Sequence, residues 1–299
     1  MNILSIIALA VAFIAPGAMA IELGVNNNDP TCNDNTGVPF CTITGALDIS
    51  MPGDTITVFP GDYRLHAEVN TSNLNIIGVG SPTLNFAFST LLPIITIRAD
   101  GVRFEGFDVT GVTGAISILG NNNIIAHNRV RNTGFTTIQL GNFDAEPVRV
   151  ANNTVADNQV AGGSAGIAVN GDRNIIVRNQ VSRATISPCV FVSGNNNTLK
   201  KNRVNDCNFD GFGIFGDKNK IIRNRAISNT TGFNLSAGFG LSTGLSRKNR
   251  LTRNVAIGNT TFGFNDALDG NKRNIYRRNV CKRNGIRGSL PFGLCRPQR

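Results

Sequence analysis

Residues 121–130 read Asn-Asn-Asn-Ile-Ile-Ala-His-Asn-Arg-Val, and the pattern that begins at their third Asn recurs six more times along the chain. Each copy starts with an Asn and has an apolar residue two positions on, a second Asn five positions on and a small apolar residue seven positions on. The first Asn of the copies is Asn123, Asn153, Asn174, Asn197, Asn219, Asn249 and Asn274. The second is Asn128, Asn158, Asn179, Asn202, Asn224, Asn254 and Asn279.

The spacing of these copies predicts a solenoid. Successive first Asn residues lie 30, 21, 23, 22, 30 and 25 residues apart. A short period with small insertions is typical of stacked coils that vary only in their loops. The apolar positions do not follow a helical period and suit a short strand, a bend and another short strand. A further alternating strand follows each unit, as in residues 115–120, 166–171 and 212–216. Two or three short strands per coil describe a parallel β-helix.

The second Asn of each unit is predicted to point inward. Equivalent residues of stacked coils lie about 4.8 Å apart, so an inward Asn can donate its amide hydrogen to the carbonyl of the next Asn. In the coils before the repeat, the same position is taken by Phe107 and Val79. We therefore expect an apolar stack that gives way to an Asn ladder, and a structural rather than catalytic role for these Asn residues.

From Thr42 to Arg283 the chain resembles the right-handed parallel β-helix repeats of the pectin-lyase-like superfamily. Residues 42–48 form a short amphipathic segment, and residues 52–63 resemble the start of that family's first coil. The resemblance implies an all-β, single-domain, right-handed parallel β-helix with a short N-terminal capping helix. The superfamily contains lyases, hydrolases, epimerases and adhesins, so the resemblance specifies a fold and not an activity.

Residues 1–20 are almost entirely apolar and end in Ala18-Met19-Ala20, which predicts a signal peptide cleaved after Ala20. A membrane anchor is the alternative. The run lacks the Lys or Arg that normally begins a signal peptide, and it is just long enough to span a bilayer. We expect an N-terminal segment over residues 21–41 and the β-helix domain over residues 42–299. The mature protein is predicted to be secreted, extracellular or periplasmic, monomeric, and without a membrane span.

Six cysteines in an exported chain predict three disulfides. Proximity in sequence favours three pairs: Cys32–Cys41, Cys189–Cys207 and Cys281–Cys295. The first pair would hold the N-terminal cap and the last the C-terminal segment, where a solenoid frays. The other pairings of six cysteines remain open at this stage.

Charge is distributed unevenly along the chain. Residues 1–150 contain six Lys plus Arg and twelve Asp plus Glu, whereas residues 151–299 contain 23 and 7. The residue four positions after each first Asn, on the outer side of the predicted bend, is in turn His127, Asp157, Arg178, Lys201, Arg223, Arg253 and Arg278. Cations stacked at strand spacing repel one another, and an anion along them relieves the repulsion.

We predict that Arg178, Lys201, Arg223, Arg253 and Arg278 bind an acidic polysaccharide such as pectate or alginate. A merely solvated basic face is the alternative. Nucleic acid and anionic membranes fit less well, because no aromatic residues interleave with the cations as a single-strand binder requires. We therefore expect no nucleic-acid partner.

Catalytic motifs of the resembled family are mostly missing. The Asn-Thr-Asp, Asp-Asp and Gly-His-Gly motifs of its hydrolases and the Asp-Pro-His-Glu stretch of its epimerases do not occur. One constellation remains: His127, Asp157 and Arg178 occupy the same position on three successive coils, as a base, an orienting carboxylate and an anion clamp would. Plain surface ion pairing is the alternative interpretation.

No cofactor is predicted with certainty, although Asp266 and Asp269 could ligate calcium, with an ordinary turn as the alternative. Two hypotheses follow for the function. The first is a lyase-like enzyme acting on an acidic glycan, and the second is a non-catalytic glycan-binding or structural β-helix of a surface or matrix. A groove bordered by the long loops at residues 135–148 and 230–244 would favour the enzyme.

Overall fold

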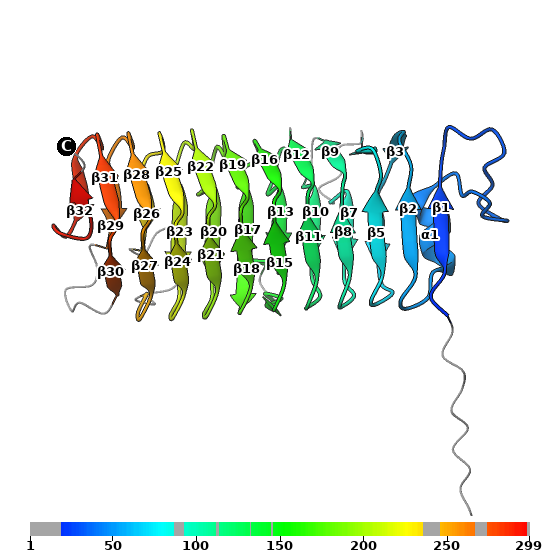
Figure 1. Cartoon of the computed structure of the whole chain (residues 1–299), viewed down its shortest axis with the longest axis horizontal. Coiled ribbons are helices and arrows are strands. Elements are labelled where there is room, and N and C mark those ends of the chain that lie inside the picture. The colour runs from blue at the N-terminus through cyan, green and yellow to red at the C-terminus, as the bar shows by residue number, and fades with distance from the viewer. Residues whose placement is uncertain are drawn as a thin grey trace, which may run out of the picture.

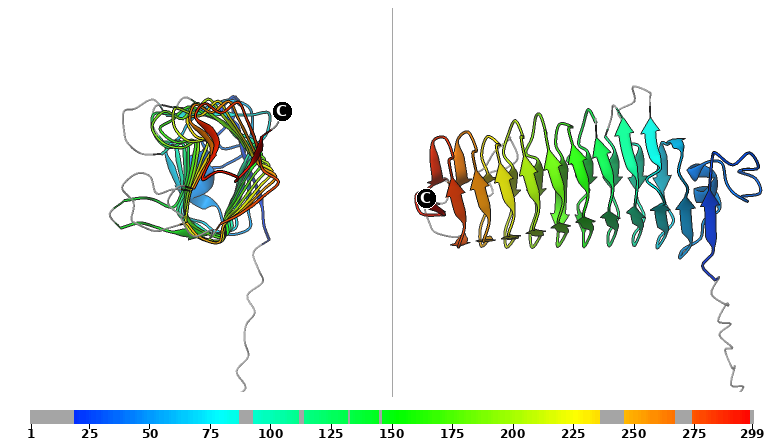
Figure 2. Two further views of the ribbon diagram at one scale, coloured as in Figure 1. Left: turned by 90° about the vertical axis from the view of Figure 1, so that its left-hand side faces the viewer. Right: turned by 45° about the horizontal axis from the view of Figure 1, so that its top comes forward.

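The computed structural model describes residues 19–86, 93–111, 114–131, 133–144, 146–235, 246–266 and 274–297. These residues form a solenoid in which short strands stack along one axis from the N-terminal to the C-terminal end (Figure 1). Viewed end-on, the coils superimpose on a roughly three-sided outline (Figure 2). Parallel pairing throughout the three sheets confirms the predicted single-domain parallel β-helix.

Sheet A runs the length of the solenoid and contains the first strand of each repeat unit. Its strands, in order of pairing, are β1 (Glu22–Val25), β2 (Thr55–Val58), β5 (Asn75–Gly78), β8 (Arg103–Glu105), β11 (Ile124–Ala126), β15 (Thr154–Ala156), β18 (Ile175–Val177), β21 (Thr198–Lys200), β24 (Lys220–Ile222), β27 (Arg250–Thr252) and β30 (Ile275–Arg277).

Sheet B follows sheet A after a short bend in each coil. Its strands are β3 (Asp62–Arg64), β6 (Thr83–Phe86), β9 (Asp108–Gly111), β12 (Arg129–Arg131), β16 (Gln159–Ala161), β19 (Gln180–Ser182), β22 (Arg203–Asn205), β25 (Arg225–Ile227), β28 (Val255–Ile257), β31 (Val280–Lys282) and β33 (Arg296–Pro297).

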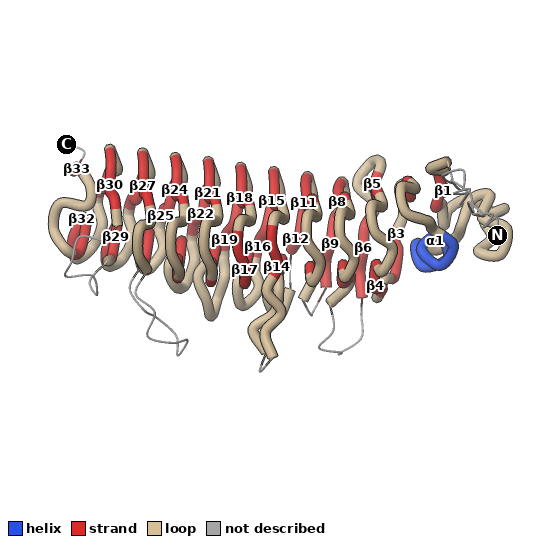
Figure 3. The backbone as a smooth tube through the Cα atoms, turned by 90° about the horizontal axis from the view of Figure 1, so that it is seen from below, coloured by secondary structure: helices blue, strands red, loops and turns tan. Residues whose placement is uncertain are grey.

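Sheet C closes each coil. Its strands are β4 (Ala67–Val69), β7 (Ile95–Ile97), β10 (Ile116–Ile118), β13 (Ile138–Leu140), β17 (Ile167–Asp172), β20 (Val190–Ser193), β23 (Phe212–Phe215), β26 (Phe233–Asn234), β29 (Phe262–Asn265) and β32 (Arg287–Leu290), and β14 (Val150–Ala151) pairs with the end of β17. Figure 3 shows the strands repeating coil by coil along the axis.

The core consists of columns of inward side chains, because alternate residues of a strand face opposite sides of the sheet. The middle residue of the sheet A strands is fully buried in coil after coil, as for Ile125, Val155 and Ile176. In sheet C, the ring of Phe233 stacks between neighbouring inward rings at centroid distances of 4.8 and 4.7 Å. Burial of such columns is the main driving force that holds the coils together.

The bend between sheet A and sheet B has two residues in each repeat unit, and its first residue adopts the left-handed conformation. Its φ lies between 53° and 58° in His127, Asp157, Arg178, Lys201, Arg223, Arg253 and Arg278. The bend does not interrupt pairing between coils, since the backbone N–H of Arg178 still donates to the carbonyl of Lys200 at 3.0 Å. The column predicted from the sequence is therefore a row of corner residues.

The second residue of the bend is the ladder Asn, and its predicted role is confirmed. The backbone N–H and the Nδ2 of Asn179 both donate to Oδ1 of Asn202, at 2.9 and 3.1 Å. The first Asn of each unit forms a second ladder through its backbone N–H, as Asn174 donates to Oδ1 of Asn197 at 2.8 Å. A third ladder, which we did not predict, connects Asn229, Asn259 and Asn284.

One ladder prediction is wrong. Phe107 is buried and donates its backbone N–H to Oδ1 of Asn128, as expected at the head of the ladder, but Val79 is 46% exposed. Four residues separate β5 from β6, whereas two separate β8 from β9. The longer bend pushes Val79 outward, and Pro82 occupies the buried position directly before β6.

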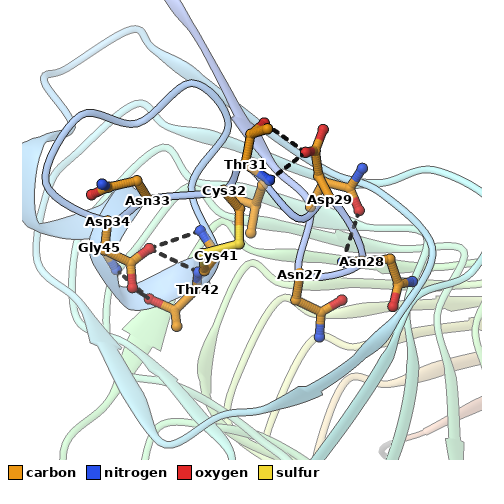
Figure 4. The surroundings of a disulfide bond; sticks show 12 residues. Asn27, Asn28, Asp29, Thr31, Cys32, Asn33, Asp34, Cys41, Thr42 and Gly45 are labelled. Carbon is orange, nitrogen blue, oxygen red and sulfur yellow. Dashed lines mark hydrogen bonds between the residues drawn. A yellow bond between two sulfur atoms is a disulfide. The ribbon is translucent and has the colours of Figure 1, made fainter.

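The N-terminal end is capped by α1 (Ile43–Ile49), as predicted. Thr42 is its N-cap and accepts a hydrogen bond from the backbone of Gly45, while Ile43 and Ala46 are buried against the first coil. Asp34 accepts from the backbone N–H groups of Cys41 and Thr42, which fixes the loop beside the cap (Figure 4). No helix among the described residues is long and apolar enough to cross a membrane. Residues 1–18 of the predicted signal peptide lie outside the described ranges.

All three predicted disulfides are confirmed: Cys32–Cys41, Cys189–Cys207 and Cys281–Cys295. The first joins the loop ahead of α1 to the residue before its N-cap (Figure 4). The last ties the C-terminal segment to β31. Both ends of the solenoid are therefore cross-linked.

Candidate functional site

A groove of about 560 Å³ lies on the outer face of sheet C in the N-terminal half of the solenoid. We call it the sheet C groove. Its floor is a column of outward side chains in register across four strands, Glu68, Thr96, Ser117 and Gln139. Residues 135 and 136, before β13, line it on one side, and residues 142, 144 and 148, after β13, line it on the other. The long stretch predicted at residues 135–148 contains β13, and the segments before and after that strand border the groove.

An ionic cluster occupies the N-terminal end of the groove. Arg98 Nη2 lies 2.8 Å from Glu68 Oε1, and the two side chains are 50% and 45% exposed. The hydrogen bond from Arg98 holds the pKa of Glu68 below its ordinary value against the opposing effect of burial, helped by the positive charge of Arg98. Glu68 is therefore ionised at neutral pH.

His66 lies at the same end of the groove. Its Nδ1 is 2.8 Å from the carbonyl oxygen of Pro93. A carbonyl only accepts, so Nδ1 carries the hydrogen and the basic lone pair of the neutral ring is on Nε2. An imidazole, a guanidinium and a carboxylate therefore line one groove.

The loop that borders the groove is fastened at its base. Arg149 donates to Oδ1 of Asn170 at 2.9 Å and to Oδ1 of Asp172 at 3.0 Å, which ties the end of the loop to β17. Within the loop, Asn142 Nδ2 donates to Asp144 Oδ2 at 2.9 Å. These contacts hold the Asp144 carboxylate at the groove wall.

An aromatic cluster adjoins the groove on its C-terminal side. The Phe143 ring meets that of Phe191 edge-on at 5.5 Å, and Phe191 meets Phe215 at 5.3 Å. Phe191 and Phe215 project from β20 and β23 of sheet C and are partly exposed. The three phenylalanine rings form an apolar surface beside the groove.

The residues predicted to be catalytic lie elsewhere, at the corner between sheets A and B. Asp157 forms a two-pronged ion pair with Arg178, at 2.7 Å from Nε and 2.6 Å from Nη2, and this hydrogen bond lowers the pKa of Asp157. The side chain of His127 makes no hydrogen bond to any described residue. None of the three lines the sheet C groove.

The residues predicted to bind substrate share this corner on five successive coils. Arg223, Arg253 and Arg278 line a second groove of about 500 Å³, which we call the basic groove. Three more cations from the sheet A strands line it as well: Lys200, Arg250 and Arg277. Lys201 lies one residue from this lining, and Arg178 is paired with Asp157.

Of the two possible calcium ligands, the structure describes only Asp266. Asp266 is buried and accepts hydrogen bonds from the Tyr276 hydroxyl at 2.8 Å and from Asn274 Nδ2 at 3.1 Å. Asp269 lies outside the described residues, as does much of the loop at residues 230–244. The described residues contain no group of three or more His, Cys, Asp and Glu side chains placed to hold a metal.

A family model for the right-handed β-helix region matches residues 165–292. No curated protein matches the chain in sequence. Among solved structures, an alginate lyase from Paenibacillus sp. strain FPU-7 is similar with a TM-score of 0.61 and 12% identity, covering 93% of this chain and 98% of the other. A pectate lyase is similar with a TM-score of 0.55 and 18% identity, covering 89% and 70%. A rhamnogalacturonan lyase has a TM-score of 0.51 and 14% identity, covering 89% and 75%. The chain therefore has a right-handed parallel β-helix fold.

The residues of the sheet C groove were not predicted from the sequence. His66, Glu68 and Arg98 precede the first copy of the Asn unit, so no repeat register aligned them with later coils. A weak signal was available, since each of the four floor residues lies between two inward apolar residues, as Thr96 does between Ile95 and Ile97. That signal identifies outward positions but not which of them are brought into one groove.

Proposed function

We propose that this β-helix is a lyase that cleaves an acidic polysaccharide of the pectate or alginate kind in the sheet C groove. The observation that carries the proposal is the placement of His66, Arg98 and Glu68 along one groove bordered by a long loop. The solved structures named as lyases support it through their fold alone. The length of the solenoid suits an extended polymer rather than a small molecule.

The chemistry would be a β-elimination. A base removes the proton on the carbon next to the uronate carboxylate, the released electron pair forms a carbon–carbon double bond, and the bond from the adjacent carbon to the linking oxygen breaks. The linking oxygen leaves as a hydroxyl after taking a proton from the protonated base. His66 is the candidate base through Nε2, and Arg98 is the cation that pairs with the uronate carboxylate and stabilises the charge that develops on it. Glu68, ionised and bonded to Arg98, positions the guanidinium.

The chain contains only two histidines, which makes the test simple. Ultraviolet absorbance of the unsaturated product on polygalacturonate and on alginate, with and without calcium, measures turnover. We expect His66→Gln to lower turnover by about 10²- to 10⁴-fold, and the matched variant His127→Gln to keep it within a few-fold. Loss of turnover in His127→Gln alone would contradict an active site in the sheet C groove. It would favour catalysis by the corner residues His127, Asp157 and Arg178.

A non-catalytic glycan-binding module is the second candidate function. It is favoured by the basic groove, whose cations suit binding of a polyanion and whose lining, among the described residues, contains no carboxylate that could act as an acid or base. A wild-type protein that is retained on acidic polysaccharide but produces no unsaturated product would contradict the lyase and support this module.

We also propose that the protein is secreted. Three disulfides within one chain are typical of an oxidising compartment. The apolar run over residues 1–20 supplies the expected signal peptide. Analysis of the mature N-terminus should find Ile21 as the first residue.

A further inference from the structure

We infer that the basic groove is a second polysaccharide-binding site, which holds an acidic chain along the solenoid axis on a different face from the sheet C groove. The inference concerns binding alone and does not require the lyase chemistry. It rests on three features of the corner between sheets A and B: its shape, its charge, which has no ion-pair partner among the described residues, and its repeat.

The shape follows from the strand register. Lys200, Ile222, Thr252 and Arg277 are consecutive partners across β21, β24, β27 and β30. Long cations therefore stand at both ends of this column, with two shorter side chains between them. Arg250, two residues before Thr252, and the three corner arginines complete the rim of the hollow.

The charge of the groove is not neutralised within the described structure. All six salt bridges among the described residues involve an arginine at or before position 178: Arg98, Arg103, Arg129, Arg131, Arg149 and Arg178. Within the described part of the chain, none of the six cations of the basic groove forms a salt bridge. Like charges at coil spacing repel one another, and low salt screens them little. A bound polyanion removes that repulsion.

The repeat identifies the kind of ligand. One corner cation is presented per coil, at about 4.8 Å intervals, and a polyuronate carries one carboxylate per sugar residue, a unit about as long as one coil is high. A single-stranded nucleic acid needs aromatic or other stacking surfaces for its bases, and none of the described residues that line the groove is aromatic. The chemistry therefore favours an acidic polysaccharide.

The test is binding of the full-length protein to immobilised polygalacturonate at low salt. We expect Arg223→Gln combined with Arg253→Gln to weaken binding roughly tenfold, because each exposed contact is individually weak but both are lost together. The matched control is Arg183→Gln combined with Arg247→Gln, which removes the same charge from exposed positions outside the groove. We expect this control to change binding by less than about twofold. Unchanged melting temperatures establish that both double variants are folded.

Three results would overturn the inference: an equal loss of binding in the control variant, wild-type binding to a neutral polysaccharide as tight as to polygalacturonate, or tighter binding to single-stranded DNA or anionic phosphatidylserine vesicles. The inference and the lyase proposal fail separately. Wild-type protein that is retained on polygalacturonate but produces no unsaturated product would contradict only the lyase proposal. Wild-type turnover together with binding that the Arg223→Gln, Arg253→Gln variant keeps in full would contradict only the inference of a second site.

Discussion

An inward Asn carries both a donor and an acceptor on a short side chain, and the bend of this β-helix uses both. Asn202 Oδ1 accepts from Asn179, and its Nδ2 donates to Asn224 Oδ1 at 3.0 Å and to the carbonyl of Ile176 at 2.8 Å. Asp would lack the donor, and Gln is one carbon too long for the same reach. The bend can therefore be buried at every coil, because each residue satisfies the polar groups of its neighbours.

Replacing one ladder residue should be costly. Asn202→Leu removes the acceptor for Asn179 and the donor for Ile176 and Asn224, leaving several buried polar groups unsatisfied. We expect the free energy of unfolding to fall by about 3–5 kcal/mol, measured by chemical denaturation. The matched variant is Asn208→Ala, at an exposed site on the same coil, which should change stability by less than about 0.5 kcal/mol. A loss of under about 1 kcal/mol in Asn202→Leu would contradict the ladder account.

At the level of the coil, one disulfide takes the place of a ladder rung. Cys207 follows β22 at the corner between sheets B and C, and its backbone N–H donates to Oδ1 of Asn229 at 3.2 Å. It is thus the coil neighbour of the third Asn ladder, which continues through Asn259. Its side chain is bonded to Cys189 ahead of β20. A covalent link and a ladder of amides therefore hold the same corner in successive coils.

Removing this bridge should destabilise the middle of the solenoid. The pair is separated by 18 residues, and loop-closure reasoning assigns such a link about 2–3 kcal/mol. We expect Cys189→Ala combined with Cys207→Ala to lower the free energy of unfolding by that amount under oxidising conditions. The same denaturation experiment under reducing conditions is the control, since it should remove most of the difference between variant and wild type. An unchanged midpoint in the oxidised variant would contradict this expectation.

Across the whole molecule, the two grooves lie on different faces and in different halves. The sheet C groove is built from coils at the acidic N-terminal half, and the basic groove from coils at the cationic C-terminal half. Each coil touches only its neighbours, so stability is transmitted along the axis in steps. The caps and terminal disulfides act where each end coil lacks one neighbour.

This architecture predicts a gradient of local stability. Backbone amides of central ladder residues such as Asn158 and Asn179 should exchange with solvent most slowly, and those of β1 and β33 fastest, because opening at an end breaks one coil interface while opening in the middle breaks two. Hydrogen exchange followed by mass spectrometry measures the profile on the disulfide-intact protein. A profile that is flat from end to end would show that the solenoid opens as one unit instead.

The repeat alone determined most of the architecture. Inward positions are constrained in every coil by burial or by ladder hydrogen bonds, so Asn and apolar residues recur at the same offsets and reveal the strands, the bend and the ladder. Cysteine proximity determined the disulfides for a similar reason, since each pair closes within one coil or cap. Val79 was misplaced because an insertion in one bend shifts the offset without changing the local pattern.

Only the tertiary structure decided where the grooves lie. Outward side chains are free of the repeat constraint, so nothing in the sequence aligns Glu68 with Gln139 or brings His66 toward Arg98. Their proximity comes from coil stacking and from a loop that borders one face of sheet C. The cationic corner was visible as a repeated position, but its closure into a groove depends on Lys200, Arg250 and Arg277 from the neighbouring strands. Stacking at coil spacing converts residues more than twenty positions apart into neighbours, and that step is a property of the folded chain.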